Sequence, residues 1–260
     1  KTLWTEEGEG DKVRVIGVWD GPEEARRVGE ELESLQRRGT RLDSCAILVR
    51  AQFQTREFED RFIAIGLPYR IVGGFRFYER AEIRDALAYL RVIHQADDDL
   101  AFERIVNTPK RGLGDKAVAK IHALARAERV PLTRAAAMIL DTDELTAQAR
   151  RSLGNLVGDL ARWRTKLESS PAFAGEGDLA EHGGGALPHP ELARLILDES
   201  GYTAMLQADR SAKPAGRLEN LQELARAMED YETLGAFLEH VSLVMDNDSD
   251  AESDKVTIMT

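Results

Sequence analysis

The feature that most constrains this chain is a change in its hydrophobic period close to Gly74. Before that glycine, short apolar runs alternate with segments in which apolar residues recur every three or four positions. The runs predict strands and the other segments predict helices, in the order strand 12–19, helix 23–38, strand 45–49, helix 54–65 and strand 69–72. This β-α-β-α-β order predicts an α/β domain with a parallel sheet and right-handed crossovers.

The rest of the chain carries almost only helical patterns. From Glu79 to about Met245 the apolar residues keep a spacing of three to four, which predicts roughly seven helices and a second, all-α domain. Trp163 lies at helical spacing and is expected in the core, while the Gly- and Pro-rich segment 169–190 predicts a surface loop. A last apolar run, 256–260, predicts a strand. Because this strand reaches the final residue without a tail, we expect the sequence to be a piece of a longer chain.

Composition excludes several classes of protein. The 260 residues are 43% hydrophobic and 31% charged, as is typical of soluble globular proteins. The apolar runs are too short to span a membrane and no signal-peptide pattern opens the chain, so we expect a cytoplasmic protein with no membrane partner. A single cysteine, Cys45, excludes an internal disulfide, and the five histidines lack metal-ligand spacing. No GxxxxGKS or GxxxxGKT segment is present, so the chain has no recognisable nucleotide cradle.

The chain has a net charge of −11 and contains two stretches of opposite local charge. Between Arg104 and Arg134 there are eight basic and two acidic residues, a local balance of +6. From Leu218 to Thr260 there are eleven acidic and two basic residues, a local balance of −9. Salt screens charges over about 8 to 10 Å, so a basic patch can attract a polyanion even on an acidic protein.

The basic stretch contains a glycine-rich turn, Thr108 to Lys116, between two helical patterns. A Gly-x-Gly turn lets backbone N–H groups face outward at the start of the second helix, where the helix dipole favours an anion. The pattern predicts a phosphate clamp of the helix-hairpin-helix kind that does not read base sequence. Its residues are Lys110, Arg111, Gly112, Leu113, Gly114 and Lys116. The alternative is a plain helix connector whose lysines face solvent.

A second polar cluster, Arg50 to Arg56, directly follows the predicted strand 45–49. Ligands of open α/β sheets bind outside the carboxyl ends of the strands. Arg50 and Arg56 could hold phosphates there, and Gln52 or Gln54 could contact a base or sugar edge. The alternative is a loop at the start of a helix, with solvated arginines.

The segments around both clusters resemble the UvrD/PcrA/Rep group of superfamily 1 DNA helicases. The likeness is strongest in CAILVRAQFQTREFEDRFIAIGLPYRIVGGFRFYERAEIRDALAYLR and DDDLAFERIVNTPKRGLGDKAV, and it returns at SGYTAML and RLENLQEL. It implies an α/β RecA-like partial domain, called 2A, at residues 1–74, with a large inserted all-α helical domain, called 2B, at 75–250. The return strand of domain 2A would be 251–260. A hinge is implied near Gly73 and Gly74.

The same resemblance implies a role for the cluster after the strand. Arg50, Gln54 and Arg56 match positions of a family segment whose arginine contacts the tracked single strand. Val49 and Gln52 stand where that segment has tyrosine and asparagine, so a stacking or amide contact is not expected at those two positions.

The resemblance implies that the turn at Gly112, Leu113 and Gly114 grips the duplex backbone ahead of the fork. Ala117 stands where the family often has threonine, which removes one possible hydroxyl contact with a phosphate. The parent protein is implied to be an ATP-dependent 3′ to 5′ DNA helicase of repair or replication, with ATP and Mg as cofactors. The fragment would have no cofactor and no ATPase activity because it lacks the Walker motifs. It would contribute duplex or junction binding and regulation of unwinding, through rotation of its helical domain.

DNA is therefore the expected partner, with other DNA-repair proteins and self-association as further possibilities. A rival hypothesis makes the helical domain a protein interaction module that docks repair partners or a second helicase copy, since the acidic stretch from Leu218 is a poor surface for DNA. A third hypothesis, a base-excision enzyme, requires a catalytic Lys or Asp after the hairpin, and no candidate stands out.

Overall fold

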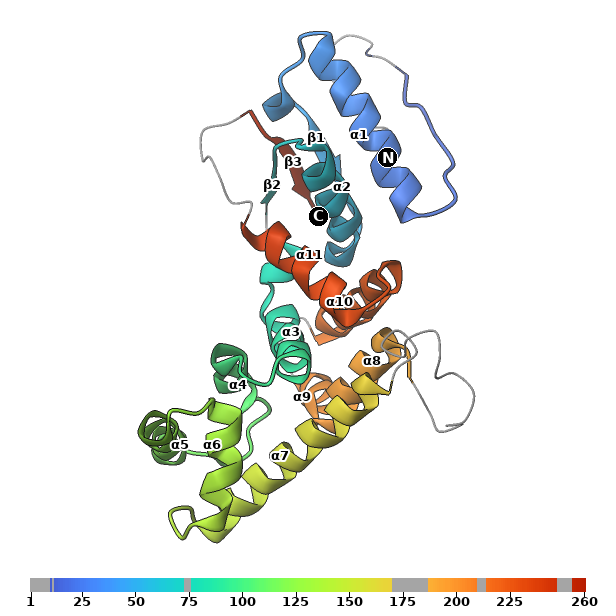
Figure 1. The fold of residues 1–260 in the computed structure, drawn as a ribbon. Helices are drawn as coiled ribbons and strands as arrows, with labels where there is room; N and C mark the ends of the chain where they lie inside the picture. Colours follow the sequence, from blue (N-terminus) through green and yellow to red (C-terminus); the bar gives the residue numbers. More distant parts are fainter. Residues whose placement is uncertain (1–9, 11, 73–75, 170–186, 210–213, 247–253) are drawn as a thin grey trace, which may run out of the picture.

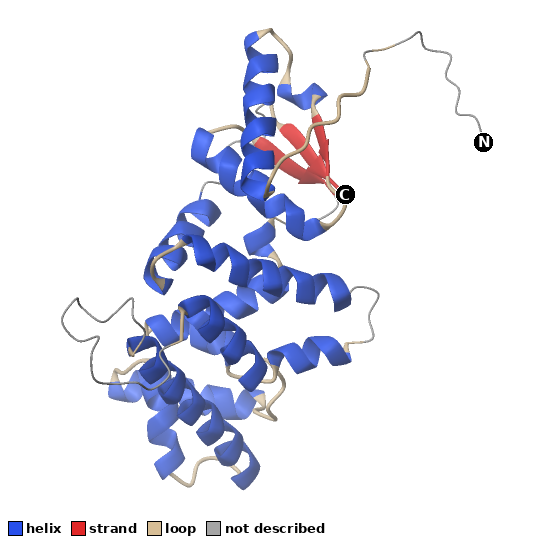
Figure 2. Cartoon of the chain, turned by 90° about the vertical axis from the view of Figure 1, so that its right-hand side faces the viewer, coloured by secondary structure: helices blue, strands red, loops and turns tan. Residues whose placement is uncertain are grey.

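A computed structural model describes residues 10, 12–72, 76–169, 187–209, 214–246 and 254–260. The described chain is mostly helical, with a small three-stranded parallel sheet. Figure 1 shows the sheet at one end of an elongated molecule and the helices α3 to α9 extending away from it. Figure 2, turned by 90°, shows the same arrangement of one sheet and many helices.

The sheet is formed by segments far apart in the sequence. β1 is Ala46–Leu48, β2 is Tyr69–Val72 and β3 is Val256–Met259. Their order is β1-β3-β2, and β3 pairs in parallel with both neighbours. In the middle of the sheet Ile258 is in register with Ile47 on one side and Ile71 on the other. Three of the four predicted strands are thus confirmed, with the last strand of the chain at the centre of the sheet.

The predicted strand over 12–19 is wrong. These residues form no strand, and Val13, Val15 and Trp19 are 91%, 94% and 95% exposed. Their alternation fits a strand, but a strand also needs a neighbour to complete its hydrogen bonds. No described strand pairs with this segment. Arg14 contacts Glu31 of the following helix through one exposed ion pair of 3.2 Å.

Two helices, α1 (Gly21–Arg37) and α2 (Thr55–Ile65), pack with the strands around one apolar cluster. α1 begins at Gly21, two residues before the predicted start, and the Asp20 side chain caps it by accepting a hydrogen bond of 2.8 Å from the Glu23 N–H. The cluster includes Ala25, Leu32, Leu42, Phe58, Phe62, Leu67, Tyr69, Val256 and Ile258. Leu48 and Val72 lie on the opposite face of the sheet and are 76% and 47% exposed. Among the described residues, helices therefore cover one face of the sheet.

The described part of residues 76–246 contains nine α-helices and no strand, which confirms the predicted helical character and gives more helices than the seven expected. They are α3 Ala81–His94, α4 Asp99–Ile105, α5 Asp115–Glu128, α6 Leu132–Met138, α7 Ala147–Glu168, α8 His189–Glu199, α9 Tyr202–Ala208, α10 Pro214–Ala227 and α11 Leu234–Asp246. Short 3₁₀ turns lie at Leu42–Ser44, Gln52–Gln54, Phe77–Glu79, Ile139–Asp141 and Met228–Asp230. Most of the predicted loop at 169–190 falls outside the described residues.

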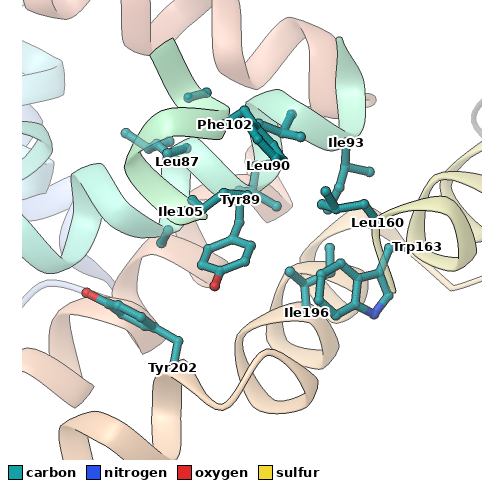
Figure 3. Close-up of a cluster of buried hydrophobic side chains, with 14 of the residues drawn as sticks. Leu87, Tyr89, Leu90, Ile93, Phe102, Ile105, Leu160, Trp163, Ile196 and Tyr202 are labelled. Carbon is teal, nitrogen blue, oxygen red and sulfur yellow. The ribbon is translucent and has the colours of Figure 1, made fainter. Parts of the chain in front are cut away.

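The long helix α3 forms the centre of the helical core. Its Tyr89 packs edge-on against Trp163 of α7 and Tyr202 of α9, with ring centroids 6.3 and 6.4 Å apart. Figure 3 shows these rings among leucine and isoleucine side chains from α3, α4, α7 and α8. Trp163 has no exposed surface, which confirms the expectation that it is a core residue. Aromatic pairs of this geometry add roughly 0.5–1.5 kcal/mol to the burial of their area.

The one-sided packing of the sheet predicts unequal effects of two truncations. Phe62→Ala removes a side chain with no exposed surface beneath the sheet, so we expect it to lower the free energy of unfolding by about 3–5 kcal/mol. Leu48→Ala, on the uncovered face, should change that free energy by less than about 0.5 kcal/mol. Urea unfolding followed by circular dichroism measures both values. Equal losses would contradict the assignment of the covered face.

Candidate nucleic-acid interface

The glycine-rich turn between α4 and α5 is anchored in the core by one side chain and is otherwise open to solvent. Leu113 is 1% exposed and belongs to the helical core, while Gly112 and Gly114 on either side of it are exposed. Gly112 has φ = +72°, a left-handed conformation that costs an L-residue roughly 1–2 kcal/mol. A Cβ atom built on Gly112 or Gly114 meets nothing within 4 Å. A flat or extended ligand can therefore approach this backbone closely.

The backbone N–H groups of this turn have an arrangement suited to an anion. Gly114 is the N-cap residue of α5, and its carbonyl accepts hydrogen bonds from the N–H groups of Ala117 and Val118. Within the described structure, the N–H groups of residues 112–116 have no protein acceptor. They lie where the helix dipole adds partial positive charge. Such a row of N–H groups can bind a phosphate oxygen without reading a base.

Arg111 does not have the role expected from its sequence position. Its guanidinium points into the protein, where it donates to the Ile105 carbonyl at 2.7 Å, to the Tyr89 hydroxyl at 2.5 Å and to the Ser200 carbonyl at 3.4 Å. Its own N–H donates to Asn107 Oδ1 at 2.8 Å. These bonds connect the turn to α3 and to the α8–α9 junction. Arg111 therefore positions the turn, and Asn107 and Tyr89 are positioning residues that sequence reasoning missed.

The surrounding cations divide into paired and unpaired groups. Arg104 is paired with Asp85 at 2.6 Å, and Lys120 with Glu144 at 3.1 Å. Within residues 104–134, the exposed basic residues for which the described structure shows no ion pair are Lys110, Lys116, Arg126, Arg129 and Arg134. Lys110 and Lys116 flank the turn. The local balance of +6 thus overstates the charge that a ligand at the turn would meet.

The second cluster lies at the carboxyl end of β1, and its residues have different environments. Arg50 is exposed, directly after the strand. The Gln54 side-chain oxygen accepts hydrogen bonds from the N–H groups of Arg50 at 3.0 Å and Ala51 at 2.9 Å. Gln54 therefore shapes the backbone that presents Arg50, and its oxygen is already occupied.

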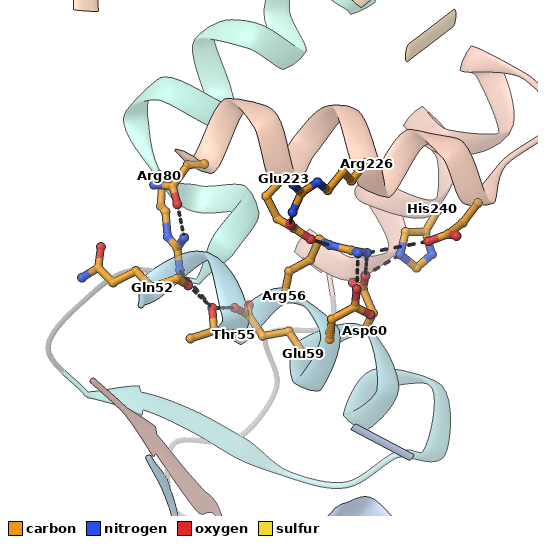
Figure 4. A network of polar contacts seen from close by, with 12 residues as sticks. Gln52, Thr55, Arg56, Glu59, Asp60, Arg80, Glu223, Arg226 and His240 are labelled. Atoms are coloured by element: carbon orange, nitrogen blue, oxygen red, sulfur yellow. Dashed lines mark hydrogen bonds and ion pairs between the residues drawn. The ribbon is translucent and has the colours of Figure 1, made fainter. Parts of the chain in front are cut away.

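Arg56 is buried, contrary to the expectation that it would meet a phosphate. Its side chain is 5% exposed and donates to Glu223 of α10 at 2.7 Å, to Asp60 at 2.9 Å and to Glu57 at 2.5 Å. Figure 4 shows the guanidinium enclosed between α2 and α10. Burial lowers the pKa of Arg56, but the surrounding carboxylates outweigh it and the pKa lies above its ordinary value. In this arrangement Arg56 joins two helices of the protein.

A second buried arginine, Arg80, also contacts both α10 and the start of α2. Arg80 donates to Asn220 of α10 at 2.9 Å, and to the Gln52 carbonyl and the Thr55 hydroxyl at the start of α2, both at 2.9 Å. Glu59, at the base of this group, accepts from the Thr55 hydroxyl at 2.6 Å. Burial raises the pKa of Glu59 to about 7, although its hydrogen bonds and Arg80 act in the opposite direction.

The two candidate contacts lie in different parts of the molecule. Figure 1 shows β1 near one end and α5, which follows the Gly112 turn, toward the other. The structure thus brings Lys110, Lys116 and the turn together, and leaves Arg50 apart from them. The predicted hinge residues Gly73 and Gly74 lie outside the described residues. In the described part of the chain, no helix is long and apolar enough to cross a membrane, and no three His, Cys, Asp or Glu residues are grouped to hold a metal ion.

Comparison with known proteins identifies the family. Residues 1–134, just over half of the chain, match the family described as UvrD-like helicase C-terminal domain. The chain belongs to the UvrD-like helicases. The matched residues include both candidate clusters, the segment after β1 and the Gly112 turn. This finding confirms the resemblance drawn from the sequence.

Three relatives support the same assignment for this UvrD-like chain. A probable DNA helicase II homolog of Rickettsia conorii is 38% identical over 263 residues, which cover 100% of this chain and 38% of that protein. DNA helicase II of Escherichia coli is 34% identical over 270 residues, covering 100% of this chain and 35% of that protein. The ATP-dependent DNA helicase PcrA of Staphylococcus epidermidis is 33% identical, covering 100% and 34%. The chain thus spans a little over a third of the length of these relatives.

The left-handed conformation of Gly112 predicts a stability difference between two glycine sites. Gly112→Ala should lower the free energy of unfolding by about 1 kcal/mol, because alanine disfavours positive φ. Gly158→Ala, on an exposed site within α7, should raise it by about 0.5–1 kcal/mol, because alanine favours a helix. Thermal and urea unfolding distinguish the two signs. Stabilisation by both substitutions would contradict the turn geometry.

The raised pKa of Glu59 predicts a pH dependence of stability. Between about pH 4.5 and 7 the folded chain keeps the Glu59 proton and the unfolded chain releases it. The free energy of unfolding should therefore fall as the pH rises through this window, by at most about 1.4 kcal/mol per pH unit, and then level off. Glu59→Gln should flatten this slope in urea unfolding at a series of pH values. Glu219→Gln, on an exposed site of α10, should keep it, and an unchanged slope in Glu59→Gln would contradict the assignment.

Proposed function

We propose that this chain is the part of an ATP-dependent 3′ to 5′ DNA helicase that binds duplex or junction DNA and regulates unwinding. Residues 1–74 and 251–260 correspond in this proposal to a partial RecA-like domain, and residues 75–250 to its inserted helical domain. Support comes from family membership, from relatives named as DNA helicases, and from the parallel sheet interrupted by helices. Repair partners and self-association of the parent protein belong to the same proposal.

The proposed DNA contact is based on one observation: in the described structure, the backbone N–H groups of residues 112–116 have no protein acceptor. A phosphate at this position would accept from the backbone, and Lys110 and Lys116 would add positive charge from either side. Leu113 and Arg111 hold the turn against the core, so binding requires little reordering of the backbone. Because phosphates are the same in every sequence, we expect affinity without base preference.

Arg50 is proposed as a second, weaker contact with a single strand. It is exposed at the carboxyl end of β1, where ligands of parallel sheets bind. Gln54 supports this contact by holding the N–H groups of the loop. Arg56 has no direct part in DNA binding in this proposal, because its guanidinium is enclosed by carboxylates.

ATP and Mg are proposed to bind elsewhere in the parent protein. The cavity at the carboxyl ends of β2 and β3, lined by Gln52, Thr55 and Arg80 among others, has a volume of about 10 Å³. A nucleotide needs a site of several hundred cubic ångströms. This cavity therefore does not fit the cofactor, and the fragment by itself is proposed to lack ATPase activity.

A second candidate function, docking of a protein partner, is favoured by one feature of the helical region. A groove of about 630 Å³ lies between the end of α3 and α11, lined by His94, Glu239 and Leu243 among others. Leu243 is 67% exposed at its edge. An apolar side chain in an open groove is typical of protein contacts, which depend less on salt than phosphate contacts do.

DNA binding is tested with a labelled duplex that carries a 3′ single-stranded tail. We expect Gly114→Glu to weaken binding at least about tenfold in fluorescence anisotropy, because a carboxylate would repel phosphate beside the open N–H groups. Gly158→Glu is the matched control, since Gly158 is also exposed with open space around it. Titrations at two salt concentrations should give a slope of log K against log salt of roughly −0.9 for each duplex phosphate neutralised.

The outcomes distinguish the two candidate functions. Loss of affinity in Gly114→Glu alone, with a salt slope in the parent chain, supports the phosphate contact. Equal binding by Gly114→Glu and Gly158→Glu would rule out the turn as the DNA contact. Absence of any salt-dependent binding would leave the α3–α11 groove as the better candidate.

A further inference from the structure

The α8–α9 junction packs against the segment that leads into the Gly112 turn. This junction, residues 200–202, opens the SGYTAML segment and lies outside both candidate DNA contacts. A Cβ atom built on Gly201 would lie 4.0 Å from Cγ of Pro109. The carbonyl of Ser200 accepts a hydrogen bond of 3.4 Å from Arg111, which is 89 positions away in the sequence. The α8–α9 junction is therefore in direct contact with residues that hold the turn.

Tyr202 is connected to α3 by a hydrogen bond at the edge of the core. Its side chain is 1% exposed, and its hydroxyl donates to Asp85 Oδ2 at 2.7 Å. The other carboxylate oxygen, Asp85 Oδ1, accepts from Nε of Arg104 at 2.6 Å. One carboxylate on α3 thus joins α9 to α4, the helix that precedes the turn. Bonds of this charge-assisted kind are short and directional.

Asp85 and Tyr89 together connect Tyr202 with the turn. They lie four positions apart on α3 and therefore project from the same face of the helix. The Tyr89 hydroxyl donates to the Thr108 carbonyl at 2.5 Å and accepts from Arg111 at 2.5 Å. Figure 3 shows the Tyr202 ring beside that of Tyr89, with their centroids 6.4 Å apart. Tyr202 thus contacts both residues of α3 that hold α4 and the start of the turn.

We propose that Tyr202, acting through Asp85 and Tyr89, is a positioning residue for the DNA contact at the Gly112 turn. This inference rests on the proposed function, because it concerns how that contact is held. Tyr202 itself is buried and does not touch DNA. The strength of a hydrogen bond falls steeply with angle and distance, so a small displacement of the N–H groups would weaken phosphate binding without any change of charge.

The hydroxyl group of Tyr202 separates positioning from simple filling of the core. Phenylalanine at this position keeps the ring and its packing, and loses only the hydrogen bond to Asp85. Tyr78 is the matched contrast, because it is also 1% exposed and its hydroxyl is buried without a hydrogen-bond partner in the described structure. Its ring packs against Phe237 of α11. Tyr78→Phe therefore removes the same atom without affecting the contacts around the turn.

The first measurement observes the turn directly, in the absence of DNA. The amide resonances of Gly112 and Gly114 are followed by NMR in protein labelled on glycine, and are assigned by their loss in Gly112→Ala and Gly114→Ala. We expect Tyr202→Phe to shift both resonances and Tyr78→Phe to leave them in place. Val241→Ala, a truncation of a side chain in α11 with no exposed surface, serves as a control for lost stability and should also leave them in place.

The second measurement is binding of the tailed duplex, at a temperature at which every variant is folded. We expect Tyr202→Phe to weaken binding about three- to tenfold, the effect of one hydrogen bond on an equilibrium. The slope of log K against log salt should stay the same, because Lys110 and Lys116 are unchanged. Tyr78→Phe and Val241→Ala should bind as the parent chain does.

Unchanged affinity in Tyr202→Phe, or an equal loss in Val241→Ala, would overturn the proposal. Loss of affinity with unmoved glycine resonances would also overturn it, because the effect would not have passed through the turn. Should Tyr202→Phe fail to fold, Arg104→Lys is measured in its place, since lysine keeps the charge and loses the Nε–H bond to Asp85. If the parent chain does not bind the duplex, the proposed function fails, and the glycine resonances still decide whether Tyr202 positions the turn.

Discussion

Hydrogen bonding on both sides of β3 is the interaction on which the rest of the structure depends. β3 lies between β1 and β2, yet it follows β2 in the sequence by more than 180 residues. The sheet can be completed only after the whole helical region has been enclosed between two adjacent strands. The entropy cost of closing a loop grows only slowly with the length of the loop. A large insertion therefore costs little more than a small one. This is why a three-stranded sheet can carry nine described helices between two neighbouring strands.

The same topology explains why the junction is polar. The helical region leaves the sheet after Val72 and returns at Val256, and these residues belong to parallel neighbours. The chain itself therefore keeps the two regions close, and no large apolar contact is needed to hold them together. The chain connection does not set the relative orientation of the two regions. Directional hydrogen bonds between charged groups are well suited to set it. The ion pair of Arg56 with Glu223 and the hydrogen bond of Arg80 to Asn220 are contacts of this directional kind, and buried ion pairs add little net free energy.

Much of the fold follows from local patterns, and the differences come from long-range contacts. Helix positions and the strands at Ala46–Leu48 and Tyr69–Val72 follow from periodicity and capping, because these depend on neighbouring residues. The 12–19 segment has the correct alternation for a strand but no described neighbour, which no local pattern can reveal. The burial of Arg56 depends on Glu223, which is 167 positions away. A cluster of basic residues in the sequence therefore does not indicate which of them face solvent.

In the candidate DNA contact, Arg111 is another basic residue that faces inward. By composition it looks like one of three cations beside the turn, but its hydrogen bonds to Ile105, Tyr89 and Ser200 turn it inward. The outward surface then consists mainly of backbone N–H groups, with Lys110 and Lys116 at its edges. Flexible lysine side chains attract an anion over several ångströms, whereas the fixed N–H groups determine where its oxygen atoms can be bound. In the proposed clamp, the backbone N–H groups would recognise the shape and charge of a phosphate. The specificity of this proposed clamp would depend on inward-facing residues such as Arg111, which hold the turn in place.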